Sequence, residues 1–257
     1  MSDSLASRAA LQRRIDRLFK PRQAVASRTV ATGHAEIDRA LSGGIQRGRL
    51  HEIIGKQPEN AASASGFTAI CARLIGGPIA WLRVKAGKHL LHPHGLHEIG
   101  LDPRQMLLVS TPDSAALLRA ADDAMRCSAL GAVVIELWRE PQRIDLTASR
   151  RLVLSAEASG VTVLLLRIAA EPTPNAAQTR WTVTAAPSSP LAANAPGFPA
   201  LDLNLLRQRG GPAGLHWRAE WNRDAAIFQP PLSGAVDAVP ARRPLADDAG
   251  ARRYGTG

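Results

Sequence analysis

The sequence predicts an α/β protein built on a mostly parallel, twisted sheet with helices on both faces. Strand-like segments alternate with helix-like segments, and the strands are continuous apolar runs rather than alternating ones. The predicted strands are 50–54, 79–84, 106–110, 132–137 and 161–167. Apolar runs of this kind are typical of parallel strands that are buried between two helical layers.

The remaining predicted elements follow from turn and capping residues. Helices are expected at 35–41, 67–75, 96–99, 114–130 and 147–160, with Asp113 or Ser114 and Thr147 as N-caps, and they end at glycine or Gly-Pro signals. The small and polar residues 56–66 are expected to form a loop. Near the C-terminal end, 179–185 and 215–221 are expected to form two antiparallel edge strands around a Pro- and Ala-rich loop at 186–200.

Three regions follow from this pattern. Residues 1–28 are expected to form a basic amphipathic helix and a linker, residues 29–228 the core domain, and residues 229–257 a disordered tail rich in Pro, Ala and Arg. The helix carries one apolar stripe, made of Leu11, Ile15, Leu18 and Phe19. This stripe is predicted to contact a partner, although a membrane surface is an alternative for a basic helix.

Composition restricts the class of protein. The chain has 257 residues, of which 45% are hydrophobic, so it can bury a sizeable core. Its apolar runs fall far short of the roughly 20 residues of a spanning helix. Cys71 and Cys127 form no C-x-x-C pair and are expected to lie in the core of a cytoplasmic protein.

The charge is strongly basic, with 32 Lys and Arg against 22 Asp and Glu. A net charge of +10 indicates a polyanionic partner, usually nucleic acid, although compositional bias toward arginine is an alternative.

Two segments resemble the RecA-type recombinases. The first contains Thr32-Gly33, Ile37-Asp38, Ala40-Leu41, Gly43-Gly44-Ile45, Gly48-Arg49-Leu50, Glu52-Ile53 and Gly55, and the second contains Gly100-Leu101-Asp102, 107–113 and 131–136. Their order and spacing match the family over roughly residues 30–170. The resemblance implies a RecA-like core around a nucleotide site.

The nucleotide site departs from the family pattern. A phosphate loop reads G-x-x-x-x-G-K-[ST], with the lysine on the outer phosphates and the hydroxyl on Mg²⁺. Here Lys56 follows Gly55 directly, the predicted loop is longer, and Gly66-Phe67-Thr68 has phenylalanine at the lysine position. The degenerate loop is therefore predicted to comprise Gly55, Lys56, Gly66 and Thr68, together with Glu136 at the Walker-B-like strand end.

The family's catalytic glutamate is also missing from its expected place after the second strand. That segment, residues 83–85, reads Arg-Val-Lys. Phosphoryl transfer depends on a cation at the phosphates and a carboxylate that orients water. We therefore expect no catalytic residues, no cofactor and no enzymatic activity.

The whole chain resembles the ImuA family of accessory proteins in bacterial error-prone translesion synthesis. The resemblance rests on the RecA-like core, the eroded loop, the basic N-terminal helix and a late segment, residues 203–221, that contains Arg207, Arg209, Arg218 and Trp221. It implies a non-catalytic scaffold of the SOS response that binds ImuB, an inactive relative of Y-family polymerases. Through ImuB it would meet an error-prone replicative-type polymerase, and it would hold DNA or RecA.

Two other functions stay open. A cell-division inhibitor of the SulA type has a related fold, and a RecA-type ATPase could use Lys56 or Lys85 as an unconventional phosphate lysine.

The candidate DNA contacts are arginines that follow the fourth and fifth strands, where the loops of related recombinases line the DNA axis. They are Arg139, Arg143, Arg150, Arg151, Arg167 and Arg180. A guanidinium suits phosphate oxygens, although a solvated, salt-bridged helix face is the alternative. His89, His92, His94 and His97 are expected to be solvated histidines and not a metal site, because Pro93 breaks the segment and no cysteine lies nearby.

Overall fold

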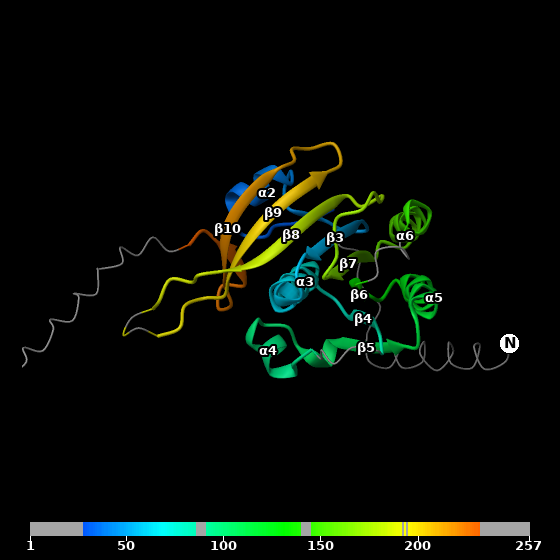
Figure 1. Cartoon of the computed structure of the whole chain (residues 1–257), viewed down its shortest axis with the longest axis horizontal. Helices are drawn as coiled ribbons and strands as arrows, with labels where there is room; N and C mark the ends of the chain where they lie inside the picture. Colours follow the sequence, from blue (N-terminus) through cyan, green and yellow to red (C-terminus); the bar gives the residue numbers. More distant parts are fainter. Residues whose placement is uncertain (1–27, 86–90, 140–144, 192, 194, 232–257) are drawn as a thin grey trace, which may run out of the picture.

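A nine-stranded sheet forms the centre of the computed structural model, which describes residues 28–231 apart from 86–90, 140–144, 192 and 194 (Figure 1). The strand order is β11-β10-β9-β8-β3-β7-β6-β4-β5, and β8 through β5 are mutually parallel. The five predicted strands are observed as β3 (Leu50–Gly55), β4 (Ile79–Val84), β5 (Met106–Thr111), β6 (Ala132–Trp138) and β7 (Thr162–Ile168). The predicted fold class is confirmed.

The C-terminal part of the sheet is larger than the sequence suggested. β8 (Thr179–Ala186) pairs parallel to β3 and is not an antiparallel edge strand. The connection from β7 has only ten residues and no helix, yet at roughly 3.3 Å per residue it can run back along the sheet. β9 (Ala200–Gln208), which was not predicted, pairs antiparallel to β8. It is followed by the antiparallel strands β10 (Leu215–Asn222) and β11 (Ile227–Gln229).

Helices cover both faces of the parallel strands. α3 (Ala61–Ile75) packs on β3, β7 and β8, while α5 (Ser114–Met125) and α6 (Leu146–Ser159) pack on the opposite face (Figure 1). α5 is capped by Asp113 and α6 by Asp145 rather than by the predicted Thr147.

Six smaller elements complete the described fold. They are β1 (Thr29–Val30), α2 (Ala35–Ala40), β2 (Ile45–Gln46), the 3₁₀ helix η1 (Pro58–Asn60), α4 (Pro93–Glu98) and the 3₁₀ helix η2 (Pro103–Gln105). No helix within the described residues is long and apolar enough to cross a membrane.

The start of α3 is the largest error in the predicted elements. The helix begins at Ala61, six residues before the expected Phe67, so the preceding loop spans only residues 56–60. The sequence Ala-Ala-Ser-Ala-Ser has no bulky residue to mark a helical period, although alanine favours helix strongly. Pro58, at the start of η1, fixes a helix-compatible φ one turn ahead.

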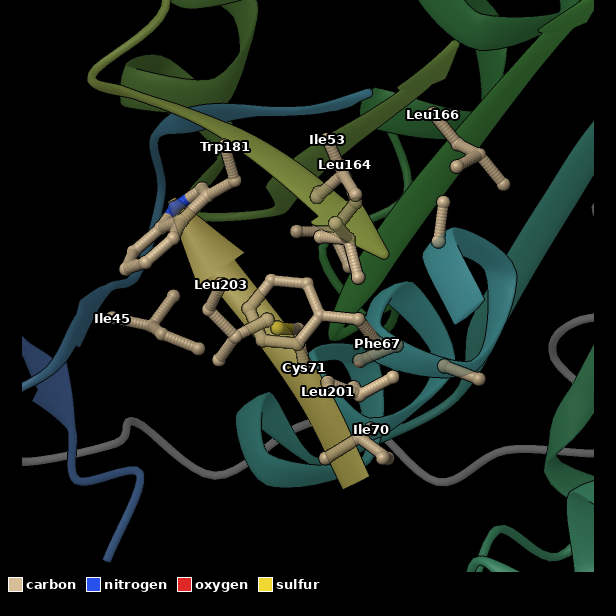
Figure 2. Packing of buried hydrophobic residues seen from close by; sticks show 14 of the residues in the cluster. Ile45, Ile53, Phe67, Ile70, Cys71, Leu164, Leu166, Trp181, Leu201 and Leu203 are labelled. Carbon is tan, nitrogen blue, oxygen red and sulfur yellow. The ribbon is translucent and has the colours of Figure 1, made fainter. Parts of the chain in front are cut away.

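The core has one cluster on each side of the sheet. On the α3 side, Phe67 packs among residues of β3, β8 and β9, such as Ile53, Trp181 and Leu203 (Figure 2). Its ring lies 5.7 Å from those of Trp181 and Phe228. On the other side, Leu117 and Leu152 bury the inner faces of α5 and α6. The antiparallel strands therefore share a core with the parallel ones through α3.

Candidate functional site

The loop between β3 and α3 occupies the place of a phosphate loop, at the carboxyl edge of the sheet. Counting from Gly55, the positions of the motif's Gly-Lys-Ser/Thr are taken by Asn60, Ala61 and Ala62. The motif's length is therefore kept, and its residue types are not. The predictions of a longer loop and of a lysine position at Phe67 were wrong.

Two of the predicted loop residues lie inside α3 instead. Gly66 and Thr68 are in the second turn of the helix and beyond, and the buried Thr68 hydroxyl donates to the Ala64 carbonyl at 2.7 Å. Neither is placed to hold a phosphate or a metal ion as a phosphate-loop residue does.

The loop uses its own hydrogen-bonding groups internally. The Gln57 amide donates to Asn60 Oδ1 at 3.1 Å, and the Asn60 amide donates to the Gln57 carbonyl at 3.0 Å. Pro58 has no amide hydrogen, and Glu59 adds an exposed carboxylate. A phosphate cradle requires free amides that converge on an anion. In this loop the amides of Gln57 and Asn60 are already engaged, and a negative side chain lies beside them.

Gly55 allows the loop to fold tightly against the start of α3. A Cβ at this position would lie 3.1 Å from the Asn60 carbonyl oxygen and 3.2 Å from the Ala64 Cβ. The close approach means that a larger residue at this position would require the start of α3 to shift by a few tenths of an ångström.

Lys56 is directed to a neighbouring loop. Its Nζ lies 3.6 Å from Oε2 of Glu171, in the connection that follows β7, and both side chains are substantially exposed. The pair contributes little to stability because water screens it. It does give the loop's only lysine a carboxylate partner.

Glu136, at the end of β6, has both carboxylate oxygens engaged. It is 5% exposed and accepts hydrogen bonds of 2.7 Å from the indole N–H groups of Trp81 and Trp138. A carboxylate whose two oxygens each already accept an indole N–H has less capacity left to orient a water molecule. Arg83 lies directly across from Glu136 in the β4–β6 register and is also buried.

A cleft remains open at this edge of the sheet. It has a volume of about 850 Å³ and lies between the start of α3, α4, the ends of β4 and β6, and the start of β9. Arg83, Glu136 and Trp138 line it together with apolar residues such as Leu96 and Leu201. The fold therefore keeps a hollow beside the degenerate loop, although the phosphate-binding groups are replaced.

Arg167 and Arg180, two of the candidate DNA contacts, belong to a buried ion cluster. Glu52, on β3, is completely buried, and its Oε1 lies 3.0 Å from Nη1 of Arg167, which is 3% exposed. Its other oxygen accepts from Nε of Arg180. Both arginines also hydrogen-bond to Thr173, in the connection between β7 and β8. These hydrogen bonds hold the β7–β8 connection against the sheet. The prediction that Arg167 and Arg180 contact DNA disagrees with this placement.

Sequence reasoning missed the role of Glu52. The available signal was a carboxylate within a strand that was predicted to be buried, because a buried charge requires a partner. The partners lie 115 and 128 positions further along the chain, so the sequence alone did not identify them.

The other candidate DNA-binding and partner-binding residues are either exposed or lie outside the described residues. Arg139, Arg150 and Arg151 are exposed, the first at the end of β6 and the other two on α6. Arg143 lies outside the described residues, as do Leu11, Ile15, Leu18 and Phe19 of the N-terminal stripe.

The histidine segment shows local roles in the part of the chain that the structure describes. His92 caps α4 by accepting from the Gly95 amide, and its ring lies 5.3 Å from that of His94. The described residues contain no group of three or more side chains that could hold a metal ion. His89 lies outside them.

Comparisons with known proteins agree with this geometry at the level of the fold. No family model matches the chain. The crystal structure of the RadB recombinase superposes with a TM-score of 0.54 and 16% identity, covering 79% of this chain and 99% of RadB. RecA of a Synechococcus species is 32% identical over 109 residues, which are 42% of this chain and 28% of RecA. The chain is a RecA-related protein, and the matched part spans less than a third of RecA itself.

A longer match defines the type of RecA relative. Protein ImuA of Caulobacter vibrioides is 29% identical over 200 residues, covering 71% of this chain and 79% of that protein. The chain is an ImuA-like protein.

Proposed function

We propose that this chain is a non-catalytic, RecA-like accessory protein of error-prone translesion DNA synthesis in the SOS response to DNA damage. In this role it binds ImuB, and through ImuB it meets an error-prone replicative-type polymerase. DNA, or a RecA filament, is a second partner. The similarity to ImuA and the RecA-like fold support the accessory role.

One observation carries the non-catalytic part of the proposal. The phosphate loop has the right length, but Asn60, Ala61 and Ala62 replace the residues that bind phosphate and Mg²⁺. The carboxylate at the Walker-B-like position is held by two indoles. Without a lysine at the phosphates and a free carboxylate, the main electrostatic contributions to phosphoryl transfer are absent from the described site.

DNA binding is supported by charge and exposure. Arg139, Arg150 and Arg151 are exposed within a chain of net charge +10. Each phosphate that is neutralised adds salt dependence to the affinity. The basic N-terminal region, with Leu11, Ile15, Leu18 and Phe19, is proposed as a further partner-binding segment.

The decisive experiment measures ATP binding and turnover by the full chain, with and without single-stranded DNA. We expect no hydrolysis above background and no saturable binding of a fluorescent ATP analogue. A DNA-stimulated activity that is lost in Glu136→Gln would overturn the proposal. Binding without hydrolysis that is lost in Lys56→Ala or Lys85→Ala would support the rival reading of an unconventional nucleotide site.

A restored loop supplies a matched positive control. The variant N60G/A61K/A62T recreates the motif at its native spacing, because the five-residue loop already has the required length. We expect it to gain measurable analogue binding relative to wild type. Equal binding by the two proteins would mean that these three positions do not decide nucleotide binding.

A further inference from the structure

The outer surface of α6 differs from an ordinary solvated helix face. Leu146, Arg150, Leu154 and Ala158 follow one another at four-residue spacing, and all four are exposed. Residues at this spacing form a single ridge along a helix. We call these four residues the α6 outer row. Three of its members are apolar, whereas a helix face that meets only water is normally polar.

The two leucines are clearly exposed in the fold. Leu154 is 66% exposed, the highest value among the large apolar side chains of the described residues, and Leu146 is 41% exposed. The opposite face of α6 is buried through Ser149, Leu152 and Ala156. The helix is therefore packed on the sheet beside α5 (Figure 1). The exposed side chains of the α6 outer row form a second, outward apolar row.

The charge on this surface is positive. Arg151 lies beside Arg150, and no ion pair joins either guanidinium to a carboxylate of the described residues. The acidic residue of α6, Glu157, is already paired with Arg49 from the start of β3. Within the described residues, two positive charges without an ion-pair partner thus lie between two exposed leucines.

We propose that the α6 outer row, with Arg151, is a docking surface for an acidic amphipathic helix of a protein partner. The row spans about 18 Å, or about three helical turns, which matches one short helix lying along it. Apolar anchors that surround arginines are typical of protein interfaces. A DNA backbone would use the arginines but would leave both leucines against charged phosphates. The inference therefore assigns Arg150 and Arg151 to the protein partner in place of DNA, and Arg139 stays the exposed DNA candidate of the described residues.

This inference rests on the proposed accessory function, because it states which surface of the chain binds the protein partner of that function. The test uses the full chain, immobilised for biolayer interferometry, with purified ImuB as the titrant. Leu154→Ser and R150E/R151E alter the surface. Leu206→Ser on β9 and Arg223→Glu, beyond β10, are the controls, because they change exposed residues elsewhere in the fold. Fluorescein-labelled oligo(dT) is titrated against the same proteins to measure DNA binding.

We expect both α6 variants to weaken ImuB binding by about tenfold or more, and the two controls to stay within about twofold of wild type. Leu154→Ser should leave oligo(dT) affinity unchanged, and circular dichroism should show an unaltered fold. If Leu154→Ser binds ImuB as tightly as the wild-type chain does, the proposed docking surface is wrong, but the proposed function is unaffected. If R150E/R151E loses oligo(dT) binding but keeps ImuB binding, the surface binds DNA, and the proposed protein-docking role is wrong. If the wild-type chain does not bind ImuB, the proposed assembly fails as well.

Discussion

Replacing Glu52 by glutamine is expected to destabilise the fold severely. The carboxylate is completely buried and paired with Arg167 and Arg180, so Glu52→Gln leaves two guanidinium groups beside a neutral amide. Removing one partner of a buried ion pair costs about 3–5 kcal/mol of unfolding free energy. In a domain of this size, that corresponds to a decrease in Tm of roughly 6–20 °C.

The assay is urea unfolding, followed in parallel by circular dichroism and tryptophan fluorescence. Glu157→Gln is the matched control because it removes the carboxylate of the exposed pair with Arg49, and it should cost less than about 1 kcal/mol. The triple variant E52L/R167M/R180M, which replaces all the charges together, should lose less stability than Glu52→Gln alone. Equal losses for Glu52→Gln and Glu157→Gln would refute the reasoning.

Three further predictions concern stability. Burial lowers the pKa of His51 to about 4, so the neutral ring is the native form, and about 3 kcal/mol of stability should be lost as the pH falls from 6.5 to 4. Urea unfolding at several pH values in this range should show the fall in unfolding free energy, and His51→Gln should make that free energy depend less on pH. Gly131→Ala should fail to give a stable fold, because a Cβ there would lie 1.7 Å from the Gly76 carbonyl oxygen; the yield of soluble protein and its Tm report this. Gly66→Ala, inside α3 with open space around it, should instead gain about 0.5–1 kcal/mol in urea unfolding.

The parallel strands were predictable because each is an apolar run between clear turn signals. The missed elements lacked such signals. β9 alternates Leu201, Leu203 and Leu205 with half-buried polar residues, but it follows a Pro-rich segment that obscured its start. The parallel placement of β8 depends on pairing with β3, which lies more than 120 residues earlier and leaves no local trace.

The candidate site was predictable in location but not in detail. Gly55 correctly marked the end of β3 and the start of the loop. The beginning of α3 was misplaced because small residues give no period, and this error moved the predicted motif positions to Gly66 and Thr68. The pairing of Arg167 and Arg180 with Glu52 could not be anticipated either, since the carboxylate comes from a distant strand.

The position of Trp138 makes its fluorescence a probe of the cleft. Four of the five tryptophans are buried in the core, whereas Trp138 is only partly buried, lines the cleft and donates its indole N–H to Glu136. The long-wavelength edge of the emission spectrum therefore comes mainly from this residue. Any molecule that enters the hollow should shift that edge toward the blue, so occupancy can be followed in the unlabelled protein, with Trp138→Phe as the blank.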